Sequence, residues 1–176
     1  MGTLRDNKQA IYFLLVFAGL YVALNSLYGL YITSWSPDPD PATQIVTRQV
    51  SFLLSLFDPG IHAVGIPGSG NVAIDNDKHR VLLVFEGCNG LNVMIVFLCF
   101  LAAFRSNIKA TLAFAAIGIL LIYAMNLGRV AALYFIAEEF PSYLYFFHKY
   151  LLTGLLYVMV FGLWIIWVNR IRRAEH

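Results

Sequence analysis

The sequence predicts an all-α integral membrane protein with about four transmembrane helices, an interfacial helix and a small extracytoplasmic β-hairpin-like insert. Composition is the first reason, because 60% of the 176 residues are hydrophobic, only 12% are charged, and the mean hydropathy is +0.71. Soluble domains carry about a quarter charged residues. The second reason is that the apolar residues gather into four long runs separated by polar segments. We expect one membrane domain over residues 1–176, in which residues 34–87 form the extracytoplasmic insert.

The positions of the basic residues predict how the chain crosses the membrane. If the four runs alternate across the bilayer, seven of the twelve Lys and Arg residues lie on one side, namely Arg5, Lys8, Arg105, Lys109, Arg170, Arg172 and Arg173. Eight of the ten acidic residues, from Asp38 to Glu139, lie on the other side. The positive-inside rule then places both termini in the cytoplasm. Membrane lipids are expected contacts, whereas a net charge of +2 without a basic stripe gives no sign of nucleic-acid binding.

The first expected span covers residues 10–33. Arg5 and Lys8 precede its apolar core, an arrangement that also occurs in cleaved signal peptides. No clear small-x-small cleavage site follows Leu24, and the apolar character continues to Ile32. These features favour an uncleaved anchor over a signal peptide.

The insert begins where the prolines of residues 36–41 end the first helix. Residues 42–57 are amphipathic, but this 16-residue stretch is short for a span and includes Arg48, so it predicts an interfacial helix. Glycine and proline then interrupt the chain. A polar turn at residues 75–80 precedes a β-rich run at residues 81–85, a pattern that predicts a small hairpin.

The three remaining spans are expected at residues 88–104, 108–136 and 148–168. The third span is long enough to protrude from the bilayer. The last one ends in Trp164 and Trp167, which are typical of the aromatic belt at a membrane interface.

Three chemically reactive side chains lie about one membrane thickness from basic residues on three different spans. The pairs are Cys88 and Arg105 (17 residues apart), Lys109 and Arg129 (20 residues apart), and His148 and Arg170 (22 residues apart). At 1.5 Å per helical residue these separations are about 26, 30 and 33 Å, close to the ~30 Å hydrocarbon thickness. If the basic residues share one side, a thiol, a guanidinium and an imidazole meet at the opposite surface, which favours a cysteine-based active site.

Each of these three side chains also has an ordinary structural interpretation. Cys88 starts a helix, where backbone N–H groups lower a thiol's pKa and favour the nucleophilic thiolate, yet it is equally explained as a buried helix-cap residue. Arg129 costs on the order of 2.5–3.5 kcal/mol if it lies centrally in the bilayer, so it either stabilises an anion or reaches lipid phosphate. His148 is either a proton shuttle near neutral pH or an interfacial aromatic-like residue.

Three polar neighbours are candidates for substrate-binding or supporting roles. Asn126 lies one helical turn before Arg129 and can orient it or the substrate. Glu86 can hold an imidazole or a substrate amine, although an ordinary outer-surface acid is equally consistent with its position. Asn89 follows Cys88 directly and belongs to the same turn.

No metal or cofactor is expected. His62 and His79 lack a partner cluster at metal-ligand spacing. Cys88 and Cys99 are 11 residues apart, about 16 Å along one helix, which is too far for a disulfide. Cys99 is therefore expected to pack as a small apolar residue, and Lys149 to contact lipid headgroups.

Three motifs resemble, in the same order, those of the exosortase/archaeosortase family of membrane transpeptidases: Cys88-Asn-Gly-Leu, Asn126-Leu-Gly-Arg129, and His148 followed by Gly154. The resemblance covers residues 81–170. The short chain and the sequence around Cys88 are most similar to the short XrtF-like branch. Two features depart from the family pattern: Asn89 stands where many members have serine, and the additional spans of larger members are missing.

The resemblance implies a catalytic set of Cys88, Arg129 and His148. It implies a cysteine-dependent peptidase that cleaves C-terminal sorting signals (a short motif, an apolar helix and a basic tail) of exported proteins. A thioester on Cys88 would then pass to a surface acceptor. The implied location is the bacterial cell (inner) membrane, with the active site on the extracytoplasmic side. A simple hydrolytic endopeptidase at the membrane interface and a non-enzymatic membrane assembly subunit are the alternatives.

Overall fold

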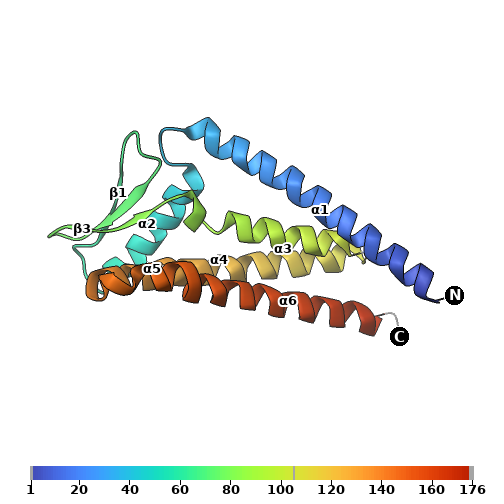
Figure 1. Cartoon of the computed structure of the whole chain (residues 1–176). Coiled ribbons are helices and arrows are strands. Elements are labelled where there is room, and N and C mark those ends of the chain that lie inside the picture. Colours follow the sequence, from blue (N-terminus) through green and yellow to red (C-terminus); the bar gives the residue numbers. More distant parts are fainter. Residues whose placement is uncertain (1, 105, 175–176) are drawn as a thin grey trace.

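The protein is mostly helical, with a small antiparallel sheet at one end of a helical bundle (Figure 1). The computed structural model describes residues 2–104 and 106–174, and the side chains of residues 8–104 and 106–172. Among the predicted basic anchors, Arg105 lies outside the described residues, and Arg5 and Arg173 lie outside the described side chains.

Twelve elements follow one another along the described chain. They are α1 (Gly2–Trp35), α2 (Pro41–Ser55), β1 (His62–Gly65), β2 (Val72–Asp75), β3 (Arg80–Val84), the 3₁₀ turn η1 (Glu86–Cys88), α3 (Leu91–Ala103), α4 (Ile108–Glu139), the 3₁₀ turn η2 (Pro141–Tyr143), α5 (Leu144–Phe146), the π-helical segment η3 (Phe147–Leu151) and α6 (Leu152–Ala174).

Three helical segments in the described part of the chain are long and apolar enough to cross a membrane. They cover Lys8–Trp35, Ile108–Glu139 and Pro141–Arg172. The predicted span 88–104 is shorter than expected, because its helix begins only at Leu91 and contains 13 residues. At 1.5 Å per residue α3 is about 20 Å long, less than the ~30 Å hydrocarbon thickness.

Aromatic side chains fill the bundle formed by α3, α4 and α6. Phe114 on α4 stacks on Trp167 of α6, with ring centroids 4.9 Å apart. Phe97 of α3 is fully buried and lies directly against Gly118, where a side chain on α4 would collide with its ring. The aromatic residues near the end of the bundle therefore fix α3, α4 and α6 against one another.

Helix α1 lies along α3 at the edge of the bundle (Figure 1). Phe13 packs on Phe100 and Phe104, with ring centroids 5.5 and 4.8 Å away. Most other apolar side chains of α1 are exposed, as expected of a helix that faces lipid.

The insert forms a three-stranded sheet, not the two-stranded hairpin that the sequence predicts. The strand order is β1-β2-β3, antiparallel throughout, with a bulge between Ile74 and Asp75. The additional strand is β1, which lies in the glycine-rich stretch where the sequence shows no β-rich run. The predicted β-rich residues 81–85 correspond closely to β3.

Helix α2 is amphipathic, as predicted, and covers the sheet. Val46, Val50 and Leu54 on its inner face are buried in a core that includes Val84 of β3 and Leu133 of α4. The outer face of the helix exposes other large apolar side chains, among them Ile45, Phe52 and Phe57 near its end. The inner face therefore holds the insert onto α4.

Candidate active site

The thiol of Cys88 contacts the imidazole of His148, at a distance of 3.4 Å between Sγ and Nε2. Cys88 ends the turn η1, directly after β3, and is buried. His148 lies in η3, before α6, and is half-buried. Two residues 60 positions apart are thus brought together where the insert meets the bundle.

Local backbone geometry positions the histidine. The segment Phe147–Leu151 is π-helical, and the Thr153 hydroxyl donates a hydrogen bond to the His148 carbonyl (2.6 Å). The wider π turn displaces the side chains of this segment relative to a regular α-helix. The imidazole packs on the ring of Phe85, with centroids 5.9 Å apart, so the residue after β3 forms one wall of the site.

Asn126 of α4 holds the cysteine turn by a hydrogen bond. Its side-chain amide donates to the Cys88 carbonyl oxygen (2.8 Å), and its own Oδ1 is buried without a partner among the described residues. Gly90 allows this close approach, because a Cβ at this position would lie only 3.1–3.3 Å from the Asn126 side chain. Gly90 also has φ +82°, a backbone conformation that other residues rarely adopt. A left-handed glycine is the usual choice where backbone and side chain approach this closely.

Arg129 lies one helical turn after Asn126 and is 8% exposed. Among the residues whose side chains the structure describes, its Nε has no hydrogen-bond partner and no carboxylate forms an ion pair with it. Its charge acts on both the Cys88 thiol and the His148 imidazole. A buried cation without an internal partner, beside a thiol, is suited to receive an anion.

Burial raises the pKa of the Cys88 thiol, and the nearby negative charge of Glu86 adds to the rise. The Arg129 charge and a hydrogen bond with the Phe85 backbone lower the pKa, but the net direction is upward. The sequence-based expectation of a thiol pKa lowered by a helix start is therefore wrong. Cys88 lies in a separate turn three residues before α3, and desolvation outweighs the favourable charges.

A hydrogen-bonded chain that the sequence did not predict supports the cysteine turn from α1 and α2. Asn89 is buried and donates to the Tyr28 hydroxyl (3.1 Å) and to the Thr43 hydroxyl (3.4 Å). The Thr43 hydroxyl in turn donates to the buried carboxylate of Asp40, the N-cap of α2. The Tyr28 hydroxyl also donates to the Glu86 carbonyl oxygen (3.0 Å). Only the helix-cap role of Asp40 could have been inferred from its position before Pro41.

Glu86 is close to Cys88 in sequence, but the structure does not bring its carboxylate to His148. The side chain is exposed and lines a separate 330 Å³ hollow together with Asp38 and Asp40. The backbone carbonyl of Glu86, and not its carboxylate, accepts hydrogen bonds around the cysteine turn. Glu86 therefore contributes negative charge near the thiol without contacting the imidazole.

The remaining polar candidates make their contacts with groups other than Cys88 and His148. Lys149 donates to the Tyr145 hydroxyl (2.6 Å), and Cys99 is a free, buried residue inside α3. His79 lies 3.3 Å from Glu138, and His62 contacts the backbone of its own turn. Within residues 2–104 and 106–174 no group of three or more His, Cys, Asp or Glu side chains is arranged to hold a metal ion.

Thiol, imidazole and guanidinium together can perform acyl chemistry. An imidazole in contact with a thiol can accept its proton, and a thiolate is a strong nucleophile. A fixed cation beside the thiol can stabilise the oxyanion that forms when the thiolate attacks a carbonyl group. The arrangement supplies a nucleophile, a base and an electrostatic stabiliser without a metal ligand set.

Comparison with known proteins places the chain in a family. No curated protein and no solved structure matches it significantly. The family model for the transmembrane exosortase (Exosortase_EpsH) matches residues 6–168, which include most of α1, the insert, the cysteine turn and most of α6. The chain therefore belongs to the transmembrane exosortase family.

Proposed function

We propose that this protein is a membrane-embedded cysteine peptidase and transpeptidase that cleaves C-terminal sorting signals of exported proteins through a thioester on Cys88. The observation that carries the proposal is the 3.4 Å contact between Cys88 Sγ and His148 Nε2 beside the buried cation of Arg129. Family membership supports a membrane protease or transpeptidase.

In the first step, His148 Nε2 accepts the thiol proton and the Cys88 sulfur attacks the carbonyl carbon of the scissile peptide bond. The carbonyl electron pair moves to oxygen, and Arg129 stabilises the resulting oxyanion. When the tetrahedral intermediate collapses, the C–N bond breaks, and the leaving amine takes the proton from His148. The product is an acyl thioester on Cys88.

In the second step, an amine or another nucleophile of a surface acceptor attacks the thioester. His148 takes the acceptor's proton and returns it to the departing sulfur, which regenerates the thiol. Water in place of the acceptor gives hydrolysis. The raised pKa of Cys88 fits this scheme, because the thiol stays protonated until His148 removes its proton in the presence of substrate.

The expected substrates are exported proteins that end in a short motif, an apolar helix and a basic tail. The proposal places the protein in the bacterial inner membrane, as a member of the short XrtF-like branch, with both termini in the cytoplasm. In this topology α3 is a fourth crossing, α2 lies at the interface, and residues 34–87 with the Cys88 site face the extracytoplasmic side. A substrate helix beside the bundle would hold its scissile bond at the depth of Cys88.

Processing of a co-expressed, C-terminally tagged substrate tests the function. Cys88→Ser should abolish processing while the amount of protein in the membrane stays unchanged. Cys99→Ser is the matched control, because Cys99 is also buried and unpaired but lies within α3, and it should retain processing. Processing by the Cys88→Ser variant at the wild-type rate would support a non-enzymatic assembly role and overturn the proposal.

Transfer and hydrolysis differ in the fate of the thioester. Mass spectrometry should detect an acyl adduct on Cys88 when substrate is present and the acceptor is withheld. An added amine should appear in the product if transfer occurs. A product that always ends in a free carboxylate, whatever the amine concentration, would identify a hydrolytic endopeptidase.

A further inference from the structure

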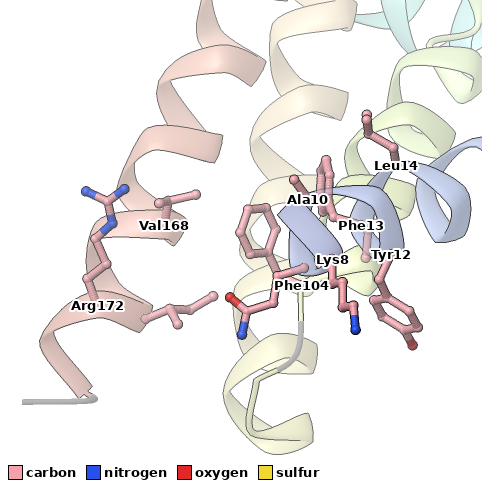
Figure 2. A pocket seen from close by; sticks show the side chains of 11 residues that line it. Lys8, Ala10, Tyr12, Phe13, Leu14, Phe104, Val168 and Arg172 are labelled. Carbon is pink, nitrogen blue, oxygen red and sulfur yellow. The ribbon is translucent and has the colours of Figure 1, made fainter. Parts of the chain in front are cut away.

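A hollow of the described structure lies at the end of the bundle opposite Cys88 and His148. Its volume is about 930 Å³. It lies between the start of α1, the end of α3 and the end of α6 (Figure 2). The residues that line it are Lys8, Gln9, Ala10, Tyr12, Phe13, Leu14, Ala103, Phe104, Val168, Ile171 and Arg172. We call it the α1–α6 cleft.

Helix α1 packs mainly on α3, and the cleft lies between α1 and α6. Phe13 anchors α1 to Phe104, with ring centroids 4.8 Å apart, and these two rings form the floor beside α3. Val168 and Ile171 line the opposite wall on α6. In a membrane, apolar surface of this kind must be covered by lipid chains or by another apolar segment.

Two cations from different helices line the same cleft. Lys8 lines it from α1 and Arg172 from α6, with Phe104 and Val168 between them, and their charged groups point in different directions (Figure 2). Among the residues whose side chains are described, no carboxylate forms an ion pair with either of them. Together with these two, residues 1–8 and 169–176 contain five Lys or Arg residues against two acidic ones.

We propose that the α1–α6 cleft binds an anionic phospholipid. The phosphate lies between Lys8 and Arg172, whose long side chains turn toward it, and the acyl chains lie along Phe13, Phe104 and Val168. Basic pockets between membrane helices are known to bind anionic headgroups, and the apolar floor is suited to the attached chains. The lipid thereby fills the space that α1 leaves beside α6.

Charge decides between this occupant and a peptide helix. A sorting-signal helix with a basic tail would bring its own cations next to Lys8 and Arg172, where like charges repel. A phosphate is attracted by both side chains, and an Arg guanidinium matches its geometry well. The site is also remote from the thiol, so this proposal does not depend on the proposed peptidase function.

Native mass spectrometry of the purified full-length protein tests the proposal, with phosphatidylglycerol and phosphatidylcholine added at equal concentrations. The wild-type protein should retain phosphatidylglycerol in preference to phosphatidylcholine. The double variant Lys8→Gln, Arg172→Gln should bind phosphatidylglycerol at least about tenfold more weakly, because two attractive charges are lost.

The matched control removes two cations that lie outside the cleft. Lys109 and Arg170 are exposed and do not line the cleft. The affinity of the double variant Lys109→Gln, Arg170→Gln for phosphatidylglycerol should therefore fall by less than about threefold, through a weaker surface attraction. Equal losses in the two double variants would mean diffuse attraction and overturn the proposal. Equal retention of the two lipids by the wild-type protein would overturn it as well.

A third variant tests the acyl-chain part of the site. Ala10→Trp narrows the cleft and keeps both cations, so phosphatidylglycerol binding should fall in this variant. Unchanged lipid binding by Ala10→Trp would show that the cleft is not the site. If millimolar inorganic phosphate displaces phosphatidylglycerol as well as added lipid does, the site recognises only the phosphate group. That result would also overturn the assignment.

Discussion

At the scale of single residues, burial and a neighbouring cation act in opposite directions on Cys88. Burial raises the pKa of the thiol, the Arg129 charge lowers it, and burial has the larger effect. The thiolate fraction is therefore small at neutral pH and grows as the pH rises toward the pKa of the folded protein. Reactivity toward a substrate then depends on the proton acceptor at 3.4 Å, His148, and not on a permanently ionised sulfur.

Alkylation of Cys88 by iodoacetamide should follow this electrostatic balance. The rate should rise with pH and reach its midpoint above the value of an unperturbed cysteine. Arg129→Gln removes the charge that favours the thiolate, so the midpoint should move further up. At a fixed pH below the midpoint, Cys88 in the Arg129→Gln variant should react roughly three- to tenfold more slowly than in the wild type. Each pKa unit changes the thiolate fraction about tenfold. Peptide mapping distinguishes Cys88 from Cys99.

Arg129→Lys separates charge from geometry. Lysine keeps the positive charge, so the midpoint of alkylation should stay nearer to that of the wild type than in Arg129→Gln. Substrate processing should still fall, because lysine lacks the planar pair of donors that can contact an oxyanion at two points. Full processing by Arg129→Lys would exclude a specific two-point contact, and an unchanged alkylation profile in Arg129→Gln would exclude the electrostatic effect.

Residue type and spacing predicted part of this site. The spacing of Cys88, Arg129 and His148 from basic residues, about one membrane thickness each, predicted that these three side chains lie at one depth. In the structure Cys88 and His148 are in contact. The chain of hydrogen bonds through Tyr28 and Thr43 was not predictable. These residues are 61 and 46 positions from Asn89, and a Tyr or Thr in an apolar helix has no sequence feature that announces such a distant partner.

At the scale of elements, long periodic patterns were predictable and local irregularities were not. The apolar runs predicted α1, α4 and α6 closely, because a run of about 20 or more apolar residues has few other solutions. The start of α3 was placed three residues too early, since Gly90 adopts a left-handed conformation and the helix begins only after it. The π-helical segment that carries His148 depends on tertiary contacts and has no simple sequence signature.

The contact between α3 and α4 depends on the absence of a side chain at Gly118. A Cβ at this position would collide with the buried ring of Phe97. Gly118→Ala should therefore destabilise the protein by about 1–3 kcal/mol, as overpacking of a core does. The measurement is the midpoint of thermal unfolding in detergent, with the wild-type protein as reference.

Gly128→Ala is the matched control on the same helix. Gly128 is exposed and has open space where a Cβ would lie, so its replacement should leave the unfolding midpoint unchanged or raise it slightly through better helix propensity. Equal destabilisation by both changes would mean that helix flexibility, and not the Phe97 contact, explains the glycine at position 118.

At the scale of the whole molecule, the two ends of the bundle differ in chemistry. Cys88 and His148 lie at one end with the insert, where most acidic residues gather, and the α1–α6 cleft with Lys8 and Arg172 lies at the other (Figure 1). In the topology that we propose from the positive-inside rule, the cleft end faces the cytoplasm. Three of the helical segments are long enough to cross the membrane in this arrangement. The topology depends on α3, because the insert and the α3–α4 connection lie on opposite sides only if α3 crosses the membrane.

Labelling with a membrane-impermeant maleimide tests the crossing by α3. On a background with Cys88→Ala and Cys99→Ala, Lys78→Cys in the β2–β3 turn and Ser106→Cys after α3 each offer one exposed thiol. If α3 crosses despite its 13 residues, intact spheroplasts should label position 78 at once, and position 106 only after permeabilisation. A short helix achieves this by local thinning of the bilayer and by the polar residues at its ends. Equal labelling of both positions before permeabilisation would show that α3 re-enters on the same side, and the four-crossing topology would then be wrong.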